Sequence, residues 1–297
     1  MLKRSRLAIA VSLSAAVLCG CGGAAEPAVT ADSARPSPTA AKDRKHQFEA
    51  AKADCMKQKG FTYVPYVQPE DKSEEVRKRD SGDYQAMRKY RARYGFGVFA
   101  AMVYPKELEG AGSDLPVADP NIKIQGQLSA AQLGAYGKGK DACLVTVGKE
   151  VLGLTVKSYA DYYKQLAKAH RTAKESALNG DPELVELATS MAACLKGKGY
   201  AVSDTKPRAM SNSGEDVFTS EMDKIGRKQK PGLSVSSAKD TSGEIWVPTL
   251  TPAQAKPYLN REIKAALDDL ECGKDFYAAY APKDMAIQRK INDQFAW

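Results

Sequence analysis

The chain has 297 residues, of which 43% are hydrophobic and 27% are charged, and its formal net charge is +8. These proportions are those of a globular protein, and they exclude a chain that is disordered or collagen-like over most of its length. No zinc-finger spacing, RNA-recognition signature or basic zipper accompanies the cationic excess, so we exclude nucleic acid as the partner.

The first twenty residues have the pattern of a signal peptide. Lys3, Arg4 and Arg6 form a positive segment, and residues 7–18 follow as an apolar segment of about a dozen residues. A membrane-spanning helix needs roughly 20 apolar residues, so this segment is too short to be one. We therefore expect residues 1–20 to be removed, which leaves 41 basic and 36 acidic residues and a net charge of +5.

The expected cleavage site is Leu18-Cys19-Gly20-Cys21, which resembles the lipobox of bacterial lipoproteins. The resemblance implies that Cys21 is acylated, palmitate being one such chain, and becomes the mature N-terminus. Cys21 would then anchor the protein on the extracytoplasmic face of the cell membrane, and two acyl chains suffice for stable anchoring. The alternative is an ordinary secretory signal that is cut near Ala24 or Ala25 and releases a secreted protein.

A tether and one large body follow the expected lipid anchor. Residues 21–41 are rich in Ala, Pro, Ser, Gly and Thr, so beyond the lipidated Cys we expect a disordered linker. Residues 42–297 are long enough for a sizeable core, and we predict a mainly α fold, a single helical body with a few short strands. From the spacing of apolar residues we expect helices at about 43–59, 82–93, 129–148, 157–178, 182–198, 216–228, 252–280 and 283–294. The short strands are expected at 61–67, 97–103, 233–236 and 244–247, and loops at 110–120 and 205–214.

Residues 53–61 and 192–200 form an internal repeat that aligns without a gap. In both copies a Cys is followed by a large apolar residue, by Lys two and four residues later, by Gly and then by an aromatic residue. This is the pattern of a helix end, where Lys favours the negative end of the helix dipole and Gly adopts the left-handed conformation that stops the helix. A weaker repeat links 128–132 to 250–254, so we predict two pseudo-repeated halves, at about 43–150 and 180–280.

Four cysteines remain after the signal peptide and Cys21, and export would place them where disulfides form. The two-half model pairs the early helix of each half with its late helix, and so predicts two disulfide bonds. The pairs are Cys55 with Cys143 and Cys194 with Cys272. Free buried thiols and pairing between the halves remain alternatives, because four cysteines allow three connectivities.

The repeated Cys-Met/Leu signature, Tyr94-Gly95-Phe96-Gly97 and the Leu-x-x-x-Gln helix starts resemble a group of uncharacterised lipoproteins and secreted proteins of actinobacteria. The resemblance covers about residues 43–280. It implies export, paired cysteines and a helical domain, and it implies no activity.

Candidate catalytic groups are few. The two histidines are His46, next to the tether, and His170, among lysines and an arginine on an expected helix surface. Ser236 and Lys239 match Ser-x-x-Lys, but in a Gly-Ser loop and without the other motifs of penicillin-recognising enzymes. Neighbouring carboxylates at Asp268, Asp269 and Glu271 do not converge on one helix face. We therefore predict no catalytic residue, no metal ligand and no cofactor.

Basic and aromatic residues are the remaining candidates for function. Basic residues crowd into 42–59, 77–93 and 164–174, which is typical of solvated helix faces and also favours anionic envelope material. We predict a non-catalytic envelope protein that binds a partner protein or an anionic wall polymer. The alternative is an envelope hydrolase whose carboxylates and tyrosines are scattered along the chain. An aromatic group, expected mainly in the core, comprises Tyr84, Tyr90, Tyr94, Phe96, Phe99 and Tyr104.

Overall fold

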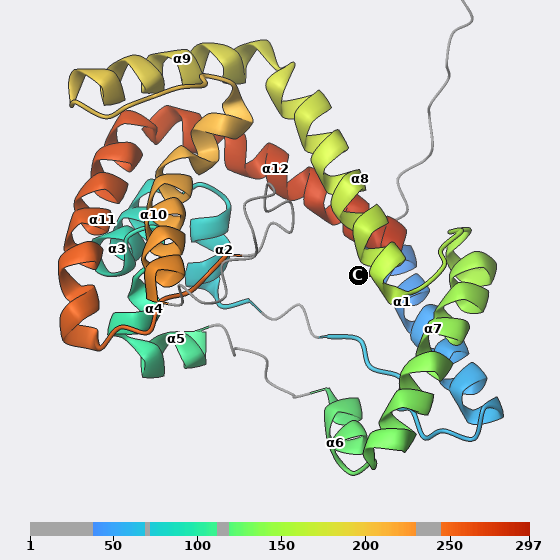
Figure 1. The fold of residues 1–297 in the computed structure, drawn as a ribbon. Helices are drawn as coiled ribbons and strands as arrows, with labels where there is room; N and C mark the ends of the chain where they lie inside the picture. Colours follow the sequence, from blue (N-terminus) through green and yellow to red (C-terminus); the bar gives the residue numbers. More distant parts are fainter. Residues whose placement is uncertain (1–37, 69–71, 112–118, 230–244) are drawn as a thin grey trace, which may run out of the picture. The chain divides into compact units, whose positions relative to one another are not determined.

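The computed structural model describes residues 38–68, 72–111, 119–229 and 245–297 (Figure 1). Within these ranges it contains twelve α-helices and no β-strand, so the fold is mainly α as predicted. The expected signal peptide, Cys21 and the expected tether up to residue 37 lie outside these ranges. None of the helices in the described ranges is long and apolar enough to cross a membrane.

The helices have the following bounds in chain order. They are α1 (Pro38–Gln58), α2 (Glu74–Asp80), α3 (Tyr84–Tyr94), α4 (Ala100–Val103), α5 (Pro105–Ala111), α6 (Pro120–Gly126), α7 (Ala130–Leu152), α8 (Tyr159–Asn179), α9 (Pro182–Gly197), α10 (Pro207–Gln229), α11 (Pro252–Cys272) and α12 (Lys274–Phe295).

Both predicted disulfide bonds are confirmed. Cys55 in the last turn of α1 is bonded to Cys143 in α7, with an Sγ–Sγ distance of 2.04 Å. Cys194 in the last turn of α9 is bonded to Cys272, the last residue of α11. Each bond therefore ties the end of an early helix to a late helix of the same expected half.

The buried core consists of several clusters that draw on both halves of the sequence. α1 and α7 pack on α8 and the end of α12, while α9 packs on α11 and the start of α12. α3 and α4 lie in the first half of the sequence, yet they pack on α11 of the second half. The residues buried where α4 meets α10 and α11 are Phe99, Ala100, Phe218, Met222 and Leu259.

The expected strand at residues 61–67 is wrong, because this segment is irregular and has no partner strand. Its backbone bonds instead to a side chain, since Asn121 Oδ1 accepts from the Val64 N–H over 2.9 Å and Asn121 Nδ2 donates to the Val64 carbonyl over 2.8 Å. The buried amide of Asn121 thus replaces one rung of a strand pairing.

The other expected strands are also not found. Residues 97–103 form a turn and then α4, because a buried carboxylate of α11 binds the backbone N–H groups of the turn. Residues 245–247 are irregular, and 233–236 lie outside the described ranges.

Helix boundaries differ from the prediction in several places. α1 begins at Pro38, inside the expected linker, and the short helices α2, α4, α5 and α6 are not among those predicted. The helix expected over 252–280 is two helices separated at Gly273. A Cβ on Gly273 would lie 2.8 Å from the Met191 sulfur and from the Tyr277 ring, so any other residue at this junction would require these two side chains to move. α10 begins at Pro207, inside a segment expected to be a loop, because Pro is well suited to the first position of a helix.

The repeated sequence forms the same helix end twice. Gly60 and Gly199 have φ values of +80° and +88°, in the left-handed region. The Phe61 N–H donates to the Met56 carbonyl over 3.0 Å, and the equivalent Tyr200 N–H donates to the Leu195 carbonyl over 3.0 Å. These bonds define a Schellman motif at both helix ends. The weaker repeat is also structural, since α7 and α11 both start with a Ser/Thr-x-x-Gln capping box.

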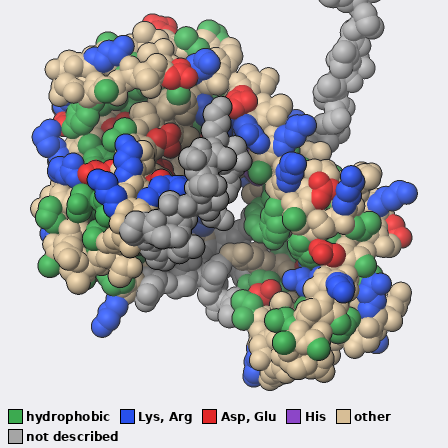
Figure 2. All heavy atoms as spheres, in the orientation of Figure 1, with side chains coloured by type: hydrophobic (Ala, Val, Ile, Leu, Met, Phe, Trp, Pro, Cys, Tyr) green, Lys and Arg blue, Asp and Glu red, His purple; other side chains and the backbone are tan. Residues whose placement is uncertain are grey.

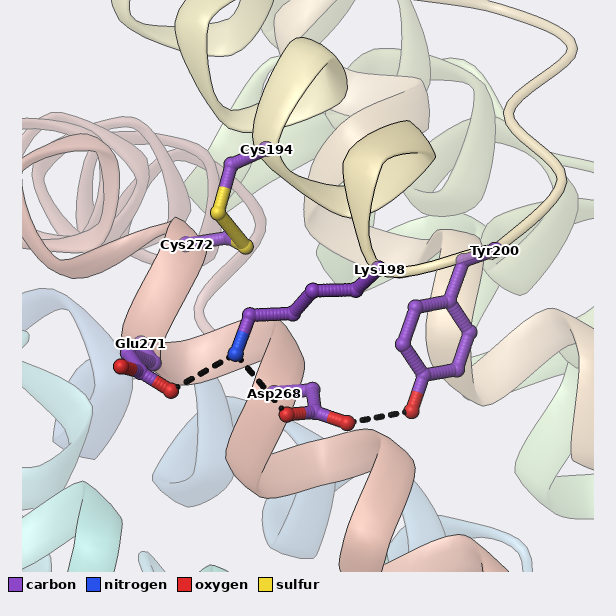
Figure 3. The surroundings of a disulfide bond; sticks show 6 residues. All are labelled: Cys194, Lys198, Tyr200, Asp268, Glu271 and Cys272. Atoms are coloured by element: carbon purple, nitrogen blue, oxygen red, sulfur yellow. Dashed lines mark hydrogen bonds and ion pairs between the residues drawn. A yellow bond between two sulfur atoms is a disulfide. The ribbon is translucent and has the colours of Figure 1, made fainter.

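The two copies differ where the aromatic residue lands. Phe61 packs against Gly139, on which a Cβ would lie 3.1 Å from the ring. Tyr200 instead donates its hydroxyl to Asp268 over 2.6 Å, next to the second disulfide (Figure 3). Gly139 and Asp268 occupy equivalent positions, because each precedes a disulfide cysteine by four residues. Phe, which has no hydroxyl, packs on a glycine there, whereas Tyr finds a carboxylate for its hydroxyl.

Candidate ligand pocket

A pocket of about 450 Å³ lies between α2, α8, α10 and α12. Its volume is in the range of pockets that hold small molecules. It is lined on one side by apolar and aromatic residues of α3 and α12, and around its rim by charged side chains. The charged residues that line it are Lys72, Arg79, Asp80, Lys174, Arg208 and Asp284.

α12 supplies one wall of the pocket. Tyr277, Tyr280, Asp284 and Gln288 follow one another at spacings of three or four residues, so they share one helix face. Gln288 donates its side-chain N–H to Asp284 over 2.5 Å, which fixes the two side chains relative to each other.

The start of α10 supplies the opposite wall. The Arg208 N–H donates to Asn179 Oδ1 over 3.0 Å, so the last residue of α8 holds the first turn of α10 in place. One turn later the Ser211 hydroxyl donates to the Tyr280 hydroxyl over 3.0 Å. This contact connects α10 to α12 across the pocket.

α2 closes the third side because a glycine lets it approach α12. Gly82, in the turn between α2 and α3, has a φ of +86°, and a Cβ there would lie 2.4 Å from the Tyr277 carbonyl oxygen. No other residue type fits this turn without moving the backbone. The close approach places Arg79 and Asp80 of α2 at the pocket.

Four cations and two carboxylates line the pocket. A third acid, Glu175, pairs with Arg208 from outside the lining, so one positive charge is left without an acid of its own. Lys72 and Arg79 share a single acid, Asp80, at distances of 2.6 and 3.3 Å. Ion pairs in which both partners are partly exposed hold their side chains only weakly, so a ligand can compete for them. The two other pairs are Lys174 with Asp284 at 2.8 Å and Arg208 with Glu175 at 2.6 Å.

The tyrosines of the pocket are neutral hydrogen-bonding groups. The Tyr277 hydroxyl donates to Asp269 over 2.6 Å, and Arg91 forms an ion pair with the same carboxylate below the pocket. Burial raises the pKa of Tyr277 and also that of Tyr280. Neither phenol is therefore prepared to lose a proton, and the arrangement is suited to holding a ligand.

The acidic group that the sequence places at the end of α11 is divided between two sides of the helix. Asp268 and Glu271 both bind Lys198, at 3.0 and 2.8 Å (Figure 3). A hydrogen bond from Lys264 is the main cause that holds the pKa of Asp268 well below its usual range. Asp269 points to Arg91 instead, and the three carboxylates do not meet.

The two histidines take up separate positions. His46 is exposed on α1, and the ring Nε2 of His170 lies 2.9 Å from Asn292 Oδ1 between α8 and α12. Ser236 and Lys239 lie outside the described residues. Among the described residues, no three His, Cys, Asp or Glu side chains gather as a metal site would require.

A second polar cluster lies beside the first disulfide bond. Lys52 forms an ion pair with Glu49, whose other oxygen accepts from the Tyr63 hydroxyl over 2.7 Å. Burial, with a smaller effect of Lys52, lowers the pKa of the nearby Lys140, whose ammonium lies 5.0 Å from the centre of the Tyr159 ring. Because Lys52, Glu49 and Tyr63 bind one another, this cluster fixes α1 to the irregular segment after it.

The aromatic group lies in or against the core. Phe99 is fully buried and stacks on Tyr258 at 4.9 Å, while Phe96 contacts Phe218. Gly95 and Gly97 within this stretch serve a buried acid, Glu262, whose carboxylate accepts from three consecutive backbone N–H groups. The Gly-Phe-Gly sequence is therefore a structural turn.

The pocket leaves no continuous pattern in the sequence, because its residues come from five helices and the segment before α2. Two partial signals exist, since Arg79 and Lys174 belong to the basic segments 77–93 and 164–174. The remaining signal is the periodic spacing of Tyr280, Asp284 and Gln288, which also fits an ordinary core face.

The fold and the pocket together define a helical protein whose helices are linked by two disulfide bonds. Its pocket has the size of a small molecule and is lined by more cations than carboxylates. No family model matches the chain, and no curated protein or solved structure is detectably similar to it. The resemblance to actinobacterial lipoproteins therefore stays a prediction.

Proposed function

We propose that this chain is a lipid-anchored envelope protein without catalytic activity, and that it binds an anionic ligand in the pocket between α2, α8, α10 and α12. The observation that carries the proposal is the excess of cations over carboxylates around a pocket of about 450 Å³. Placing a charged group of the ligand among partly enclosed cations strengthens their attraction relative to open water.

The balance of charges in the pocket favours a ligand whose bound unit carries one negative charge. Asp80 accepts from two cations, so Lys72 or Arg79 can turn to a ligand while the other keeps the ion pair. Hydroxyl and amide groups of Ser211 and Asn212 lie beside the cations and suit a polar ligand. A phosphodiester or a sugar carboxylate, as in an anionic envelope polymer, has this chemistry.

The pocket offers less support for a hydrolase. Its two lining carboxylates, Asp80 and Asp284, are each engaged by a cation at 2.6 and 2.8 Å. Binding is accordingly the function that we propose.

Calorimetry with the unlipidated chain tests the pocket. Glycerol phosphate and glucuronate should bind at low salt, whereas neutral glycerol should not. Arg208→Gln should weaken binding at least tenfold, because it removes one charge-assisted contact of about 1.5–3 kcal/mol. Lys123→Gln, an exposed change on α6, is the matched control. Equal binding of glycerol, or equal binding by the Arg208→Gln and Lys123→Gln variants, would contradict the proposal.

Fractionation of cells tests the anchor separately. Cys21→Ala should release the protein from membranes, because acylation of this residue provides the proposed attachment. Wild-type protein should stay in the membrane fraction after a high-salt wash, and retention of the Cys21→Ala variant in that fraction would contradict lipid anchoring.

A further inference from the structure

The outer face of α8 carries three exposed cations at successive turns, Lys164, Lys168 and Arg171. We refer to these three residues as the α8 basic stripe. Within the described part of the chain, the ion pairs of α8 are formed by Lys174 and Glu175, which lie beyond the stripe. The stripe therefore presents its charge to the surroundings, and Figure 2 shows Lys and Arg side chains along α8.

No acid interrupts this face of α8. The helix has no Asp or Glu between Asp161 and Glu175. Asp161 precedes the stripe and is occupied locally, since its Oδ2 accepts from the Lys157 N–H over 2.9 Å and from Gln165 over 3.1 Å. The positive potential of the stripe is thus not cancelled along the helix.

An exposed aromatic pair lies at the start of the same helix. Tyr163 is 44% exposed and Trp297 is 54% exposed, and their rings meet edge to face with centroids 5.2 Å apart. The backbone of Trp297 is held in place, because its backbone N–H donates to the Asn292 carbonyl over 2.8 Å. The Tyr162 hydroxyl donates to the Phe295 carbonyl over 2.6 Å and fixes this end of α12 to α8.

We propose that the α8 basic stripe and the Tyr163–Trp297 pair dock the protein onto an anionic bilayer surface. Lys and Arg near such a surface are attracted to its headgroups, and Trp and Tyr prefer the level of the headgroups because one part of each ring is apolar and another is polar. A soluble polyanion would use the cations but would leave the aromatic pair in water. The combination selects the bilayer.

The expected tether leads to this part of the fold. α1 begins at Pro38, and its residue Phe48 packs in one cluster with Tyr162 and Phe295. The segment from Cys21 to Pro38 spans at most about 60 Å when extended, so lipid anchoring would keep the face close to the membrane. The inference rests on the proposed anchoring only for this proximity.

Vesicle binding of the unlipidated chain tests the docking face independently of the anchor. The chain carries Cys21→Ala, and Trp246→Phe leaves Trp297 as the single tryptophan. At low salt it should sediment with vesicles that contain phosphatidylglycerol and should not sediment with phosphatidylcholine alone. Trp297 emission should shift to the blue on binding, and brominated lipids should quench it.

Charge reversal measures how much the α8 basic stripe contributes to vesicle binding. Each cation near an anionic surface contributes about fivefold, so loss of three should lower the partition coefficient about 100-fold, and reversal of the three charges should lower it further because the new acids are repelled. Trp297→Ala should abolish membrane insertion of the aromatic pair and weaken binding about tenfold or more. The stripe variant is K164E/K168E/R171E, and the matched control on α6 and α7, which should bind as before, is K123E/K138E/K149E.

Several results would overturn the docking face. These are equal binding to both kinds of vesicle, equal loss in the stripe variant and its control, or binding without any change in Trp297 emission. Binding of soluble polyglutamate through the stripe, with no binding to vesicles, would also reject the bilayer and favour a polymer. Circular dichroism of every variant confirms that it is folded. A failure here leaves calorimetry of the pocket unaffected, because the stripe residues do not line it.

Discussion

Glu262 is fully buried on α11, and its carboxylate holds the turn that starts α4. Oε1 accepts from the N–H groups of Gly97 and Val98 over 2.8 and 2.9 Å, and Oε2 accepts from Phe99 over 2.9 Å. Glu262→Ala leaves three donors without an acceptor, at about 1–3 kcal/mol for each donor that stays dry. Because water can reach part of the vacated space, we expect the free energy of unfolding to fall by about 4 kcal/mol.

Glu262→Gln keeps the shape of the side chain and replaces one oxygen by an N–H₂ group, which faces a donor. We expect this variant to lose about half as much stability, roughly 2 kcal/mol. Urea unfolding measures both changes, and the thermal midpoint of Glu262→Ala should fall by about 8–16 °C. Glu271→Ala is the control on the same helix, since Glu271 is 67% exposed and its ion pair with Lys198 contributes less than about 1 kcal/mol. If Glu262→Ala lowers the free energy of unfolding by an amount within about 1 kcal/mol of that of the control, the reasoning is refuted.

Three further changes test the fold. Replacing Cys194 and Cys272 by Ala opens a loop with a sequence separation of 78, and should lower the free energy of unfolding by about 4.5 kcal/mol in urea without reductant; an unchanged midpoint would contradict a structural role. Asp268→Asn should cost about 1 kcal/mol at neutral pH. Because the folded-state pKa of Asp268 is depressed, its contribution is present above the ordinary Asp pKa, and the two unfolding curves should converge as the pH falls through the folded pKa. Gly82→Ala combines a positive φ with a 2.4 Å contact to Tyr277, so thermal melting should show a loss of about 3 kcal/mol or more, and a smaller loss than 1 kcal/mol would show that the turn relaxes easily.

The helix ends could be predicted because their physics is local. The seven consecutive residues from each repeated Cys to the aromatic residue contain the lysines, the left-handed glycine and the residue that folds back. Two copies of one helix end also imply two similar supports for them. That inference led from the sequence to both disulfide bonds, although four cysteines permit three different connectivities.

Contacts between distant segments could not be predicted in the same way. The strand expected over 97–103 follows from its β-branched and aromatic residues, yet the segment is bent by an acid about 165 positions away in the sequence. Nothing in the residues around Glu262 distinguishes it from an exposed acid on a helix. Likewise, Asn121 gives no local sign that it binds Val64, 57 positions earlier.

The crossing of the two halves explains how a pocket can arise in a repeated fold. The loop closed by Cys55 and Cys143 contains α2 to α6, and α3 and α4 from this loop pack on α11, which belongs to the other disulfide loop. α2 then meets α10 and α12 at the pocket. Neither half alone holds the full set of cations, because Lys72 and Arg79 come from the first loop and Arg208 from the second. Each disulfide closes a loop that supplies part of the pocket, α2 from the first loop and α10 from the second. The entropy that the two bonds remove from the unfolded chain stabilises the fold in which these helices meet.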